Sequence, residues 1–527
     1  MRRALKAALL AIATALLGVA IAFLPFGLAL ERKIGLAALF HLRGPLPTPA
    51  GVAVIAIDDQ TGGRLGLSNL PRDWPRSIHG RLVDRLIELG ATAIAFDFDF
   101  QLAKKPEDDA VFAASLAAAK RVVLAEKLSG KRQPVTDATG RQRGSVWIEK
   151  LLMPVPMLAN AARGLGAFPL PKVEVAVHEF WAFKPSIGGA PTMPAVMLQV
   201  VAMPAYRHWY ALAQKSGAPW ARRLLAPPED GVPPEVLRDF MRNTHALVGQ
   251  DPAIADHLRS AEGDFSARER AALRALATLY AGDDHRLLNF YGPAGTIETV
   301  PYHLVAGQPV DGEAPPDLKG KAVFVGFSDL YDPGQPDRFY TVFTNRDGVD
   351  LSGVEIAATA FANLVEDASV ETLGGGSELA LIGAYGASMA ALLYLLPAIA
   401  GVPLALALAG SYTVFAYSAF VSRNLALPLA VPMLVQLPVA VFAGLLLQYL
   451  SERRKKTRAA KAISLYLPEH LARDFTEKNF DTADLNRVTY SVCFASDMAG
   501  FTSIAEKLKP KELAVFLNDY FESLSEP

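Results

Sequence analysis

The stretch Val52–Asp59 (VAVIAIDD) decides the fold class, because an unbroken run of six apolar residues leads directly into two carboxylates. The stretch Ala91–Asp99 (ATAIAFDFD) repeats this pattern further along the chain. Continuous apolar runs of this length are typical of strands that are buried on both faces of a sheet. We therefore expect an α/β domain built on a parallel sheet.

The residues between these two runs predict a helix. Apolar side chains recur there at spacings of three and four, at Ile78, Leu82, Leu86 and Leu89. Gly90 is a typical helix end, so strand, helix and strand form one right-handed crossover unit. The runs Arg121–Ala125 and Lys321–Gly326 predict further strands of the same sheet. Together these segments predict one large domain.

Asp58, Asp97 and Asp99 follow the ends of the two apolar runs. Open α/β sheets place their ligand crevices at this edge, so these carboxylates could line a pocket for a cation or a polar ligand. Alternatively they cap the following loops by accepting backbone N–H bonds, as Asp commonly does at turns. We favour the capping interpretation.

Composition indicates that part of the chain leaves water. Of the 527 residues, 51% are hydrophobic, against roughly 45–50% in soluble domains. The formal net charge of −1 indicates no partner, because long charge-free tracts alternate with a basic cluster. Cys493 is the single cysteine, which excludes an intrachain disulfide and a cysteine-based metal cluster within one copy.

The first charge-free tract, Ala7–Leu30, predicts a membrane span near the N-terminus. It is long enough to cross about 30 Å of hydrocarbon as a helix. A cleaved signal peptide is the alternative, although its apolar region usually has only about 7–15 residues. We favour a retained signal anchor.

Two further charge-free tracts predict three more spans. Leu379–Ser422 is about twice the length of one span, and Pro397–Pro403 supplies a turn near its middle, so it predicts a helical hairpin. Leu425–Leu450 contains three prolines, which a membrane bundle tolerates better than a water-soluble helix. No charged or polar pair lies inside the spans, which argues against a transporter.

The basic residues that flank the spans predict the orientation. Arg2, Arg3 and Lys6 precede the first span, and a cluster that begins with Arg453 and ends with Lys461 follows the last. By the positive-inside rule both termini are cytoplasmic, and residues from about 31 to 377 lie outside. We read the basic cluster as an ordinary flank of the span rather than as a specific lipid-binding site.

The order of segments resembles the CHASE type 2 extracellular sensor domain over about residues 40–370. The segments that carry the resemblance are VAVIAIDD, LPRDWPRSIHGRLVDRLIELGATAIAFDFDF, NFYGPAGTIETVPYHLV, LKGKAVFVGFSD and GVDLSGVEIAATAFANLV. The resemblance implies one span before the sensor and three after it, linked to a cytoplasmic cyclase, histidine kinase or protein kinase. The middle, about residues 125–285, matches loosely, and Ala205–Ala281 looks like a helical elaboration.

Near the C-terminus, SDMAGFTSIAEKLKPKELAVFLNDYF resembles the start of a class III nucleotide cyclase domain. The strand-like run Arg487–Ala495 precedes it, and a helix that begins at Pro510 and carries an apolar stripe follows. The family signature is an Asp, an aliphatic residue, any residue, Gly, Phe or Tyr, and Thr. It falls on Asp497, Met498, Ala499, Gly500, Phe501 and Thr502.

This second resemblance implies a site for two divalent cations, Mg²⁺ or Mn²⁺, which carboxylates suit. Asp497 would hold both ions, and the backbone carbonyl of Met498 would add a ligand. The backbone amides of Gly500, Phe501 and Thr502 would face the phosphates of the substrate. The alternative is a solvent-exposed Asp before an ordinary helix cap. The family's second metal-binding Asp and its transition-state groups are not found in this sequence, so we expect the 527-residue chain itself to be inactive.

The sequence thus predicts a multi-domain membrane protein with an extracytoplasmic α/β sensor domain, four transmembrane helices and the start of an α+β (ferredoxin-like) cyclase domain. The predicted segments are the signal anchor (1–33), the sensor (34–376), three transmembrane helices (377–451), a cytoplasmic connector (452–486) and the start of the cyclase (487–527). We expect a sensor-regulated adenylate cyclase of the cell inner membrane, a homodimer that converts ATP to cyclic AMP and pyrophosphate. Its other expected partners are an unidentified external ligand and membrane lipid, without nucleic acid. A non-catalytic sensor and a guanylate cyclase are the alternatives.

Overall fold

The computed structural model describes residues 2–136, 142–170, 176–307, 315–329, 337–344, 349–463, 490, 492, 495 and 497–525. The chain divides into two compact units. The larger unit consists of Ala15–Tyr385 and Leu406–Gln436. The smaller unit consists of Met1–Thr14, Gly386–Ala405 and Leu437–Pro527.

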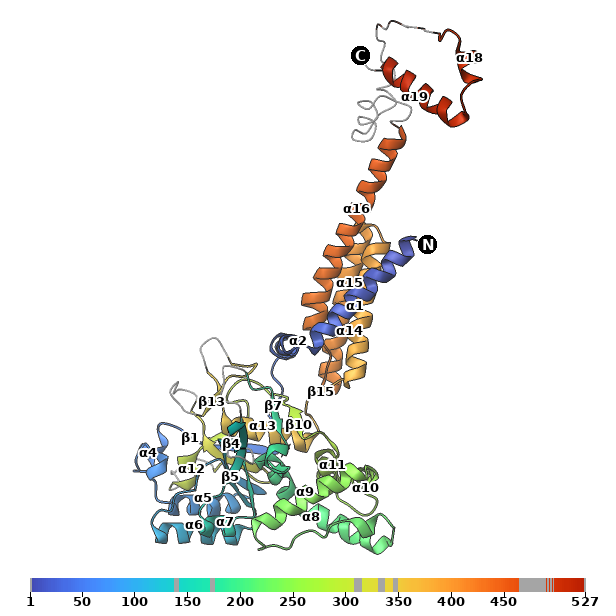
Figure 1. Ribbon diagram of the computed structural model, residues 1–527. Coiled ribbons are helices and arrows are strands. Elements are labelled where there is room, and N and C mark those ends of the chain that lie inside the picture. Colours follow the sequence, from blue (N-terminus) through green and yellow to red (C-terminus); the bar gives the residue numbers. More distant parts are fainter. Residues whose placement is uncertain are drawn as a thin grey trace. The chain divides into compact units, whose positions relative to one another are not determined.

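A parallel sheet of six strands forms the centre of the larger unit (Figure 1), in the order β11-β1-β12-β2-β3-β6. The strands are β1 (Val52–Ile57), β2 (Ala93–Phe96), β3 (Val122–Ala125), β6 (Gly164–Gly166), β11 (Thr299–Pro301) and β12 (Ala322–Phe327). The four predicted strands are therefore confirmed, with small differences at their ends. However, β12 lies between β1 and β2, so these two strands are not neighbours, and the crossover between them passes β12.

Helices cover both faces of this sheet, as the alternation of buried side chains along β1 shows. Val52, Val54 and Ala56 belong to one apolar core, and Ala53, Ile55 and Ile57 belong to the other. The first core is closed by α8 (Met193–Ser216), α9 (Pro234–Gln250), α10 (Ala253–Ser260), α11 (Ala267–Ala281) and α13 (Gly353–Glu366). The second core is closed by α5 (Ser77–Glu88), α6 (Pro106–Ala119), α7 (Pro156–Ala161) and α12 (Tyr302–Ala306).

The predicted crossover helix is α5, whose apolar side chains Ile78, Leu82 and Leu86 are buried. It ends at Glu88, and Gly90 follows with a left-handed φ of 84°. The predicted helical elaboration is also present, as α8 to α11, and it begins earlier than expected, at Met193. These helices supply a large share of the buried residues of the first core.

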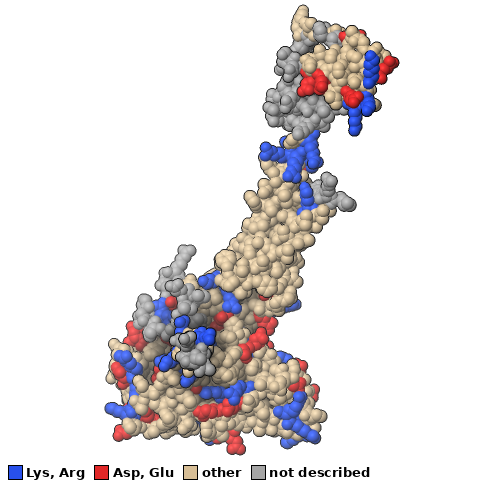
Figure 2. All heavy atoms as spheres, viewed as in Figure 1, with Lys and Arg blue, Asp and Glu red and all other residues tan. Residues whose placement is uncertain are grey.

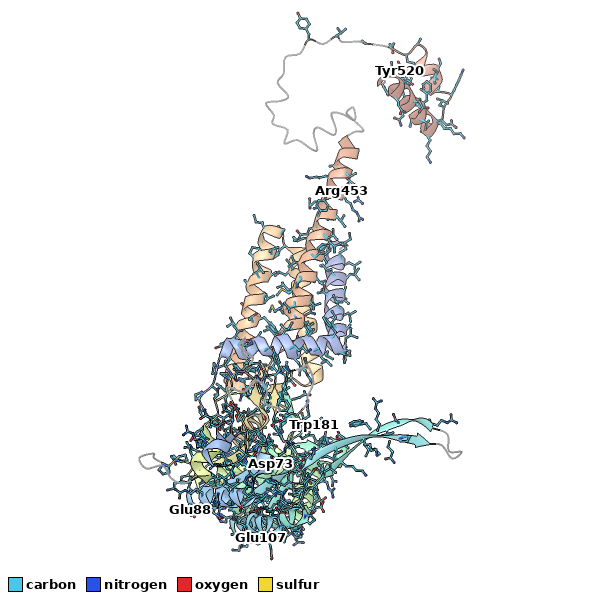
Figure 3. The ribbon with its side chains drawn as sticks, turned by 90° about the vertical axis from the view of Figure 1, so that its left-hand side faces the viewer. Asp73, Glu88, Glu107, Trp181, Arg453 and Tyr520 are labelled. Atoms are coloured by element: carbon cyan, nitrogen blue, oxygen red, sulfur yellow. The ribbon has the colours of Figure 1, made fainter. Side chains whose placement is uncertain are left out.

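A long antiparallel hairpin extends away from the sheet (Figure 3) and consists of β4 (Lys127–Thr136) and β5 (Gln142–Leu152). The remaining strands are short: β7 (Glu179–Trp181), β8 (Phe183–Lys184), β9 (Ala190–Pro191), β10 (His285–Leu287), β13 (Arg338–Phe339), β14 (Leu351–Ser352), β15 (Glu371–Thr372) and β16 (Leu425–Ala426). Among them, β15 pairs with β16 in parallel. This pairing connects the segment after α13 with the segment before the last apolar helix.

Four helices are long and apolar enough to cross a membrane, in agreement with the four predicted spans. They are α1 (Arg2–Phe23), α14 (Gly375–Leu395), α15 (Ala398–Arg423) and the run Val431–Ala459, which joins the π-helix Val431–Gln436 to α16 (Leu437–Ile463). On the face drawn in Figure 2, most of the length of these helices carries no charged side chains. The hairpin turn is tighter than predicted, because α15 begins at Ala398 and includes Pro403.

The predicted first span is broken at its end. After α1, Leu24 is extended and Pro25 starts α2 (Pro25–Leu30), which continues through the π-helix Glu31–Leu36 into α3 (Ala37–Arg43). Pro25 cannot donate a helical hydrogen bond, which explains the break at this position. The chain therefore changes direction between α1 and the sheet domain.

At the C-terminal end, the structure contains α18 (Phe501–Ala505) and α19 (Pro510–Ser525). The helix predicted to begin at Pro510 is confirmed. The predicted connector (452–486) begins as the end of α16, and its remainder after Ile463 lies outside the described residues, as does most of the predicted strand Arg487–Ala495.

Candidate functional site

The signature segment near the C-terminus forms one tight turn that leads into α18. Gly500 has a left-handed φ of 77°, a conformation that favours glycine, and its carbonyl accepts the N–H bonds of Ser503 and Ile504 at 3.0 and 3.2 Å. A Cβ at Gly500 would contact nothing within 4 Å, so the conformation, not space, requires glycine. The exposed Asp497 lies at the start of the turn.

Two of the predicted ligand groups in this segment bond to each other. The N–H of Phe501 donates to the carbonyl of Met498 at 3.3 Å, although the first was expected to face phosphate and the second to bind metal. Nowhere in the part of the chain that the structure describes do three His, Cys, Asp or Glu side chains gather as a metal cluster. The described residues therefore supply one carboxylate here, which does not by itself hold two cations.

The carboxylates at the carboxyl ends of the strands stabilise turns. Asp58 Oδ1 accepts a hydrogen bond from the Thr61 hydroxyl, and its N–H donates to the same hydroxyl at 3.1 Å. Asp99 Oδ1 accepts the N–H of Gln101 at 3.1 Å, and its Oδ2 lies 3.0 Å from Lys127 Nζ. These contacts support the capping interpretation for Asp58 and Asp99. The backbone N–H of Asp97 donates to Val325 in the neighbouring strand.

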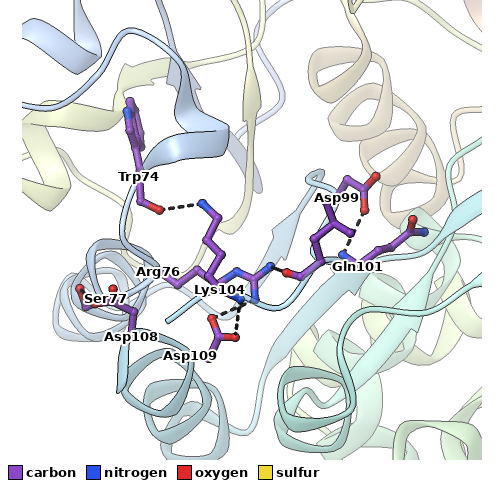
Figure 4. Close-up of polar contacts among 9 residues, drawn as sticks. Trp74, Arg76, Ser77, Asp99, Gln101, Lys104, Asp108 and Asp109 are labelled. Carbon is purple, nitrogen blue, oxygen red and sulfur yellow. Dashed lines mark hydrogen bonds and ion pairs between the residues drawn. The ribbon is translucent and has the colours of Figure 1, made fainter. Parts of the chain in front are cut away.

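A buried ion pair closes the same edge of the sheet (Figure 4). The Arg76 side chain is 3% exposed, its Nη1 lies 2.9 Å from Asp109 Oδ1, and its Nη2 donates to the carbonyl of Leu102. Lys104 donates from its amine to the carbonyl of Trp74 and from its backbone N–H to Asp109. The contacts fasten the loop after β2 to the starts of α5 and α6, so these described residues serve a structural role at this edge.

The buried His79 lies beside this ion pair among aromatic rings. Its Nδ1 is 2.8 Å from the Tyr302 hydroxyl, and the rings of Phe96, Phe100 and Phe112 are centred within 6 Å. Burial, together with the charges of Lys104 and Arg76, lowers the pKa of His79 to about 3. His79 is therefore a neutral core residue at physiological pH.

A network around the buried Asn289 joins four elements of the larger unit. Its Oδ1 accepts from Arg43 Nη1 at 2.6 Å, at the end of α3. Its Nδ2 donates to the carbonyl of Ala368 at 2.8 Å and to Asn424 Oδ1 at 3.1 Å, just after α15. Its backbone N–H donates to Asn363 Oδ1 in α13, and Asn363 Nδ2 donates back to its carbonyl. Asn289 therefore ties the sheet domain to the segments next to the apolar helices.

Glu31 makes a second connection of this kind. Its carboxylate accepts the backbone N–H groups of Leu429, Ala430 and Val431 at 2.9, 2.9 and 2.7 Å. These N–H groups stand at the start of the last apolar run, where they lack partners within the helix. Burial raises the pKa of Glu31, and the three backbone N–H bonds oppose this effect.

Sequence reasoning missed both connections. Asn289 lies in the quoted segment NFYGPAG, but its amide bonds to residues far away in the sequence. The only available signal for Glu31 was a carboxylate placed directly after a charge-free tract.

Comparison with known families identifies the larger part of the chain. The family described as CHASE2 domain matches residues 9–393. The chain belongs to this family. No curated protein and no solved structure matches the chain.

The CHASE2 match covers the parallel sheet, the helices α8 to α11 and most of α1 and α14. The predicted sensor domain is therefore shown, and with the four apolar helices it indicates a membrane sensor protein. The match ends before the signature segment, so the cyclase stays a prediction.

Two cavities lie among the described residues of the larger unit. One, of about 530 Å³, lies next to Glu31 and is lined by Arg32, His285, Arg286 and Glu371 among others. The other, of about 670 Å³, lies at the amino ends of the sheet strands. Both volumes fall within the range of small-molecule sites, about 300–1,000 Å³.

Proposed function

We propose that this CHASE2 protein is a membrane sensor that regulates a cytoplasmic adenylate cyclase, which forms cyclic AMP and pyrophosphate from ATP. The observation that carries the sensor role is the Asn289 network. It connects the sheet domain through Arg43 to the segment after α1 and through Asn424 to the segment after α15. A change in the sheet domain would therefore act on two chain segments that continue into apolar helices.

The cyclase part of the proposal rests on the resemblance of Asp497–Thr502 to the class III signature. The left-handed Gly500 and the start of α18 at Phe501 support it, because the signature requires a glycine turn that opens a helix. Asp497 would bind the divalent cations, and the amides after it would approach the phosphates of ATP. We further propose the inner membrane as the location, a cytoplasmic catalytic part and a homodimer.

The test is a cyclic nucleotide assay on membranes that contain the protein as its gene encodes it. With Mg²⁺ or Mn²⁺ we expect cyclic AMP from ATP and little cyclic GMP from GTP. Asp497→Asn keeps the size of the side chain and removes its charge, so activity should fall by about 100-fold or more. Asp519→Asn, at an exposed position of α19, is the matched control and should keep its activity.

Each alternative predicts a different assay result. Cyclic GMP as the main product would support the guanylate cyclase. No product with either nucleotide, in a protein that inserts and folds, would support a non-catalytic sensor. Full activity of Asp497→Asn would show that the segment does not bind the cations.

A further inference from the structure

The cavity of about 670 Å³ lies at an unexpected edge of the sheet. Gly51, Thr92, Arg121 and Gly320 line it, and they precede the strands β1, β2, β3 and β12. Open α/β sheets usually bind ligands at the opposite, carboxyl edge of their strands. Here the carboxyl edge is occupied by the Arg76–Asp109 ion pair and by turn contacts. This cavity therefore lies at the edge opposite to the one that such sheets usually use.

The charged side chains that line this cavity are mainly cationic. The five cationic residues are Lys120, Arg121, Arg163, Arg207 and Arg268, and the two anionic residues are Asp230 and Glu269. Glu269 is already engaged, since it accepts hydrogen bonds from the Ser266 hydroxyl and pairs with His208 at 3.0 Å. Five cations against two carboxylates leave an excess of three positive charges. Such an excess attracts anions.

Arg163 is buried at the edge of the cavity without a full set of partners. The residue is 5% exposed, and its Nη1 donates to the carbonyl of Glu229 at 2.9 Å. Its Nη2 is buried, makes no hydrogen bond within the described chain, and lies 3.4 Å from Asp230 Oδ1. Burial lowers the pKa of Arg163, because a charged guanidinium is less stable in the protein interior than in water.

Asp230 does not fully compensate this buried charge. The same carboxylate accepts two hydrogen bonds from Arg207, at 2.7 and 3.3 Å. Two guanidinium groups therefore share one carboxylate, and the Nη2 group of Arg163 lies near it without making a hydrogen bond. A buried donor that lacks an acceptor is costly, and an anion would satisfy it with a charge-assisted hydrogen bond.

The rest of the cavity wall is mostly apolar. Leu198, Val201 and Ala205 come from α8, Ala272 comes from α11, and Phe361 comes from α13. An inorganic anion would bury none of this surface, whereas a ligand with a hydrocarbon body would gain from covering it. The lining therefore favours an anionic head joined to an apolar body.

We infer that this cavity binds a small organic carboxylate with an apolar body, with its carboxylate at Arg163 and Arg207. That such an anion is the signal sensed by the protein rests on the proposed function. Its binding does not depend on any catalytic activity of the chain. The two can therefore fail independently.

The test measures binding to the full chain in nanodiscs of zwitterionic lipid by titration calorimetry, with empty nanodiscs as the blank. The probes are 1-naphthoate, its uncharged isostere 1-naphthalenemethanol and inorganic sulfate. We expect saturable binding of 1-naphthoate and at least about tenfold weaker binding of the other two, because each lacks one half of the recognised chemistry. Equal binding of the uncharged isostere would overturn the inference, as would the absence of saturable 1-naphthoate binding.

Variants locate the site. Arg163→Gln and Arg207→Gln should each weaken 1-naphthoate binding by about tenfold or more. Ala272→Phe should also weaken 1-naphthoate binding, because its larger side chain would occupy the apolar part of the cavity. This variant tests the location of the site even if Arg163→Gln unfolds the protein. Arg259→Gln, at an exposed arginine of α10, is the control and should bind like the wild type. Wild-type affinity in both Ala272→Phe and Arg207→Gln would place the binding elsewhere.

Discussion

Glu355 is a buried carboxylate at the first turn of α13, and it is 2% exposed. Its Oε1 accepts the N–H of Gly295 at 2.9 Å, and the N–H of Ile297 lies 3.5 Å away. Burial raises its pKa to about 7, although these backbone N–H groups oppose the shift. The effect of burial is the larger one, because removing a charged carboxylate from water destabilises it more than a few backbone hydrogen bonds stabilise it.

This shift predicts a pH dependence of stability. The folded-state pKa lies above the unfolded-state value, so the folded protein binds more protons between pH 4.5 and about 7. The contribution of Glu355 to the free energy of unfolding is therefore full below pH 4.5. It falls by about 3 kcal/mol as the pH rises through 7. The measurement is thermal unfolding of the purified protein across this range.

Glu355→Gln isolates this contribution, because the amide carbonyl can accept the same N–H groups without a charge. Relative to Glu355→Gln, the wild type should lose stability as the pH rises. His79 acts in the opposite sense: its lowered pKa means that stability is lost as the pH falls from 6.5 towards 3. His79 is present in both proteins, so its effect cancels in the difference between their free energies of unfolding. A difference that does not change between pH 4.5 and 7 would contradict the raised pKa of Glu355.

At the scale of elements, the sequence predicted the strands better than their neighbours in the sheet. The apolar runs gave β1, β2, β3 and β12 because strands buried on both faces read as continuous hydrophobic segments. Strand order depends on which long connection passes over which strand, and no local pattern reports that β12 inserts between β1 and β2. The amino-edge cavity was missed for the same reason, since its arginines come from separate elements.

The junction between the sheet domain and the apolar helices depends on short elements with few apolar residues. Asn424 follows α15, has a left-handed φ of 52°, and accepts the N–H of Glu371 on its carbonyl at 2.8 Å. Its side-chain oxygen accepts from Asn289. One residue therefore combines a backbone turn with a side-chain connection.

Two substitutions at Asn424 separate these roles. Asn424→Gly keeps the turn and removes the hydrogen bond to Asn289, so stability should fall by about 0.5–1.5 kcal/mol. Asn424→Ala also places an alanine in the left-handed conformation and should cost about 1 kcal/mol more. Asn289→Ala should cost more than Asn424→Gly, because it removes the acceptor of Arg43 Nη1 and the donor to the carbonyl of Ala368. Thermal unfolding followed by tryptophan fluorescence measures all three variants.

Asn243→Ala, at an exposed position of α9, is the control and should change stability by no more than about 0.5 kcal/mol. If Asn289 also transmits the signal, Asn289→Ala should abolish the response of the output to a ligand of the sensor domain while basal output remains. Stability of Asn289→Ala equal to that of the control would show that the network does not hold the junction.

At the scale of the whole molecule, the distribution of basic residues predicts the orientation in the membrane. Four apolar helices are compatible with either orientation in a membrane. The orientation follows from the basic residues near Met1 and from the cluster at Arg453, which favour the cytoplasmic side. The structure continues α16 through this cluster to Ile463, so the basic residues extend directly from the last span.

Cysteine labelling tests this orientation. In a Cys493→Ser background, single cysteines at Gln60, Ile399 and Thr457 report on the sheet domain, the hairpin turn and the end of α16, and all three positions are exposed. In intact cells a membrane-impermeant maleimide should label Gln60→Cys only, because four spans place the other two positions inside. After permeabilisation all three should react, which controls for access. Labelling of Thr457→Cys without labelling of Gln60→Cys would show the opposite orientation. Labelling of Ile399→Cys in intact cells would show that the turn between α14 and α15 is not cytoplasmic, which contradicts the predicted hairpin.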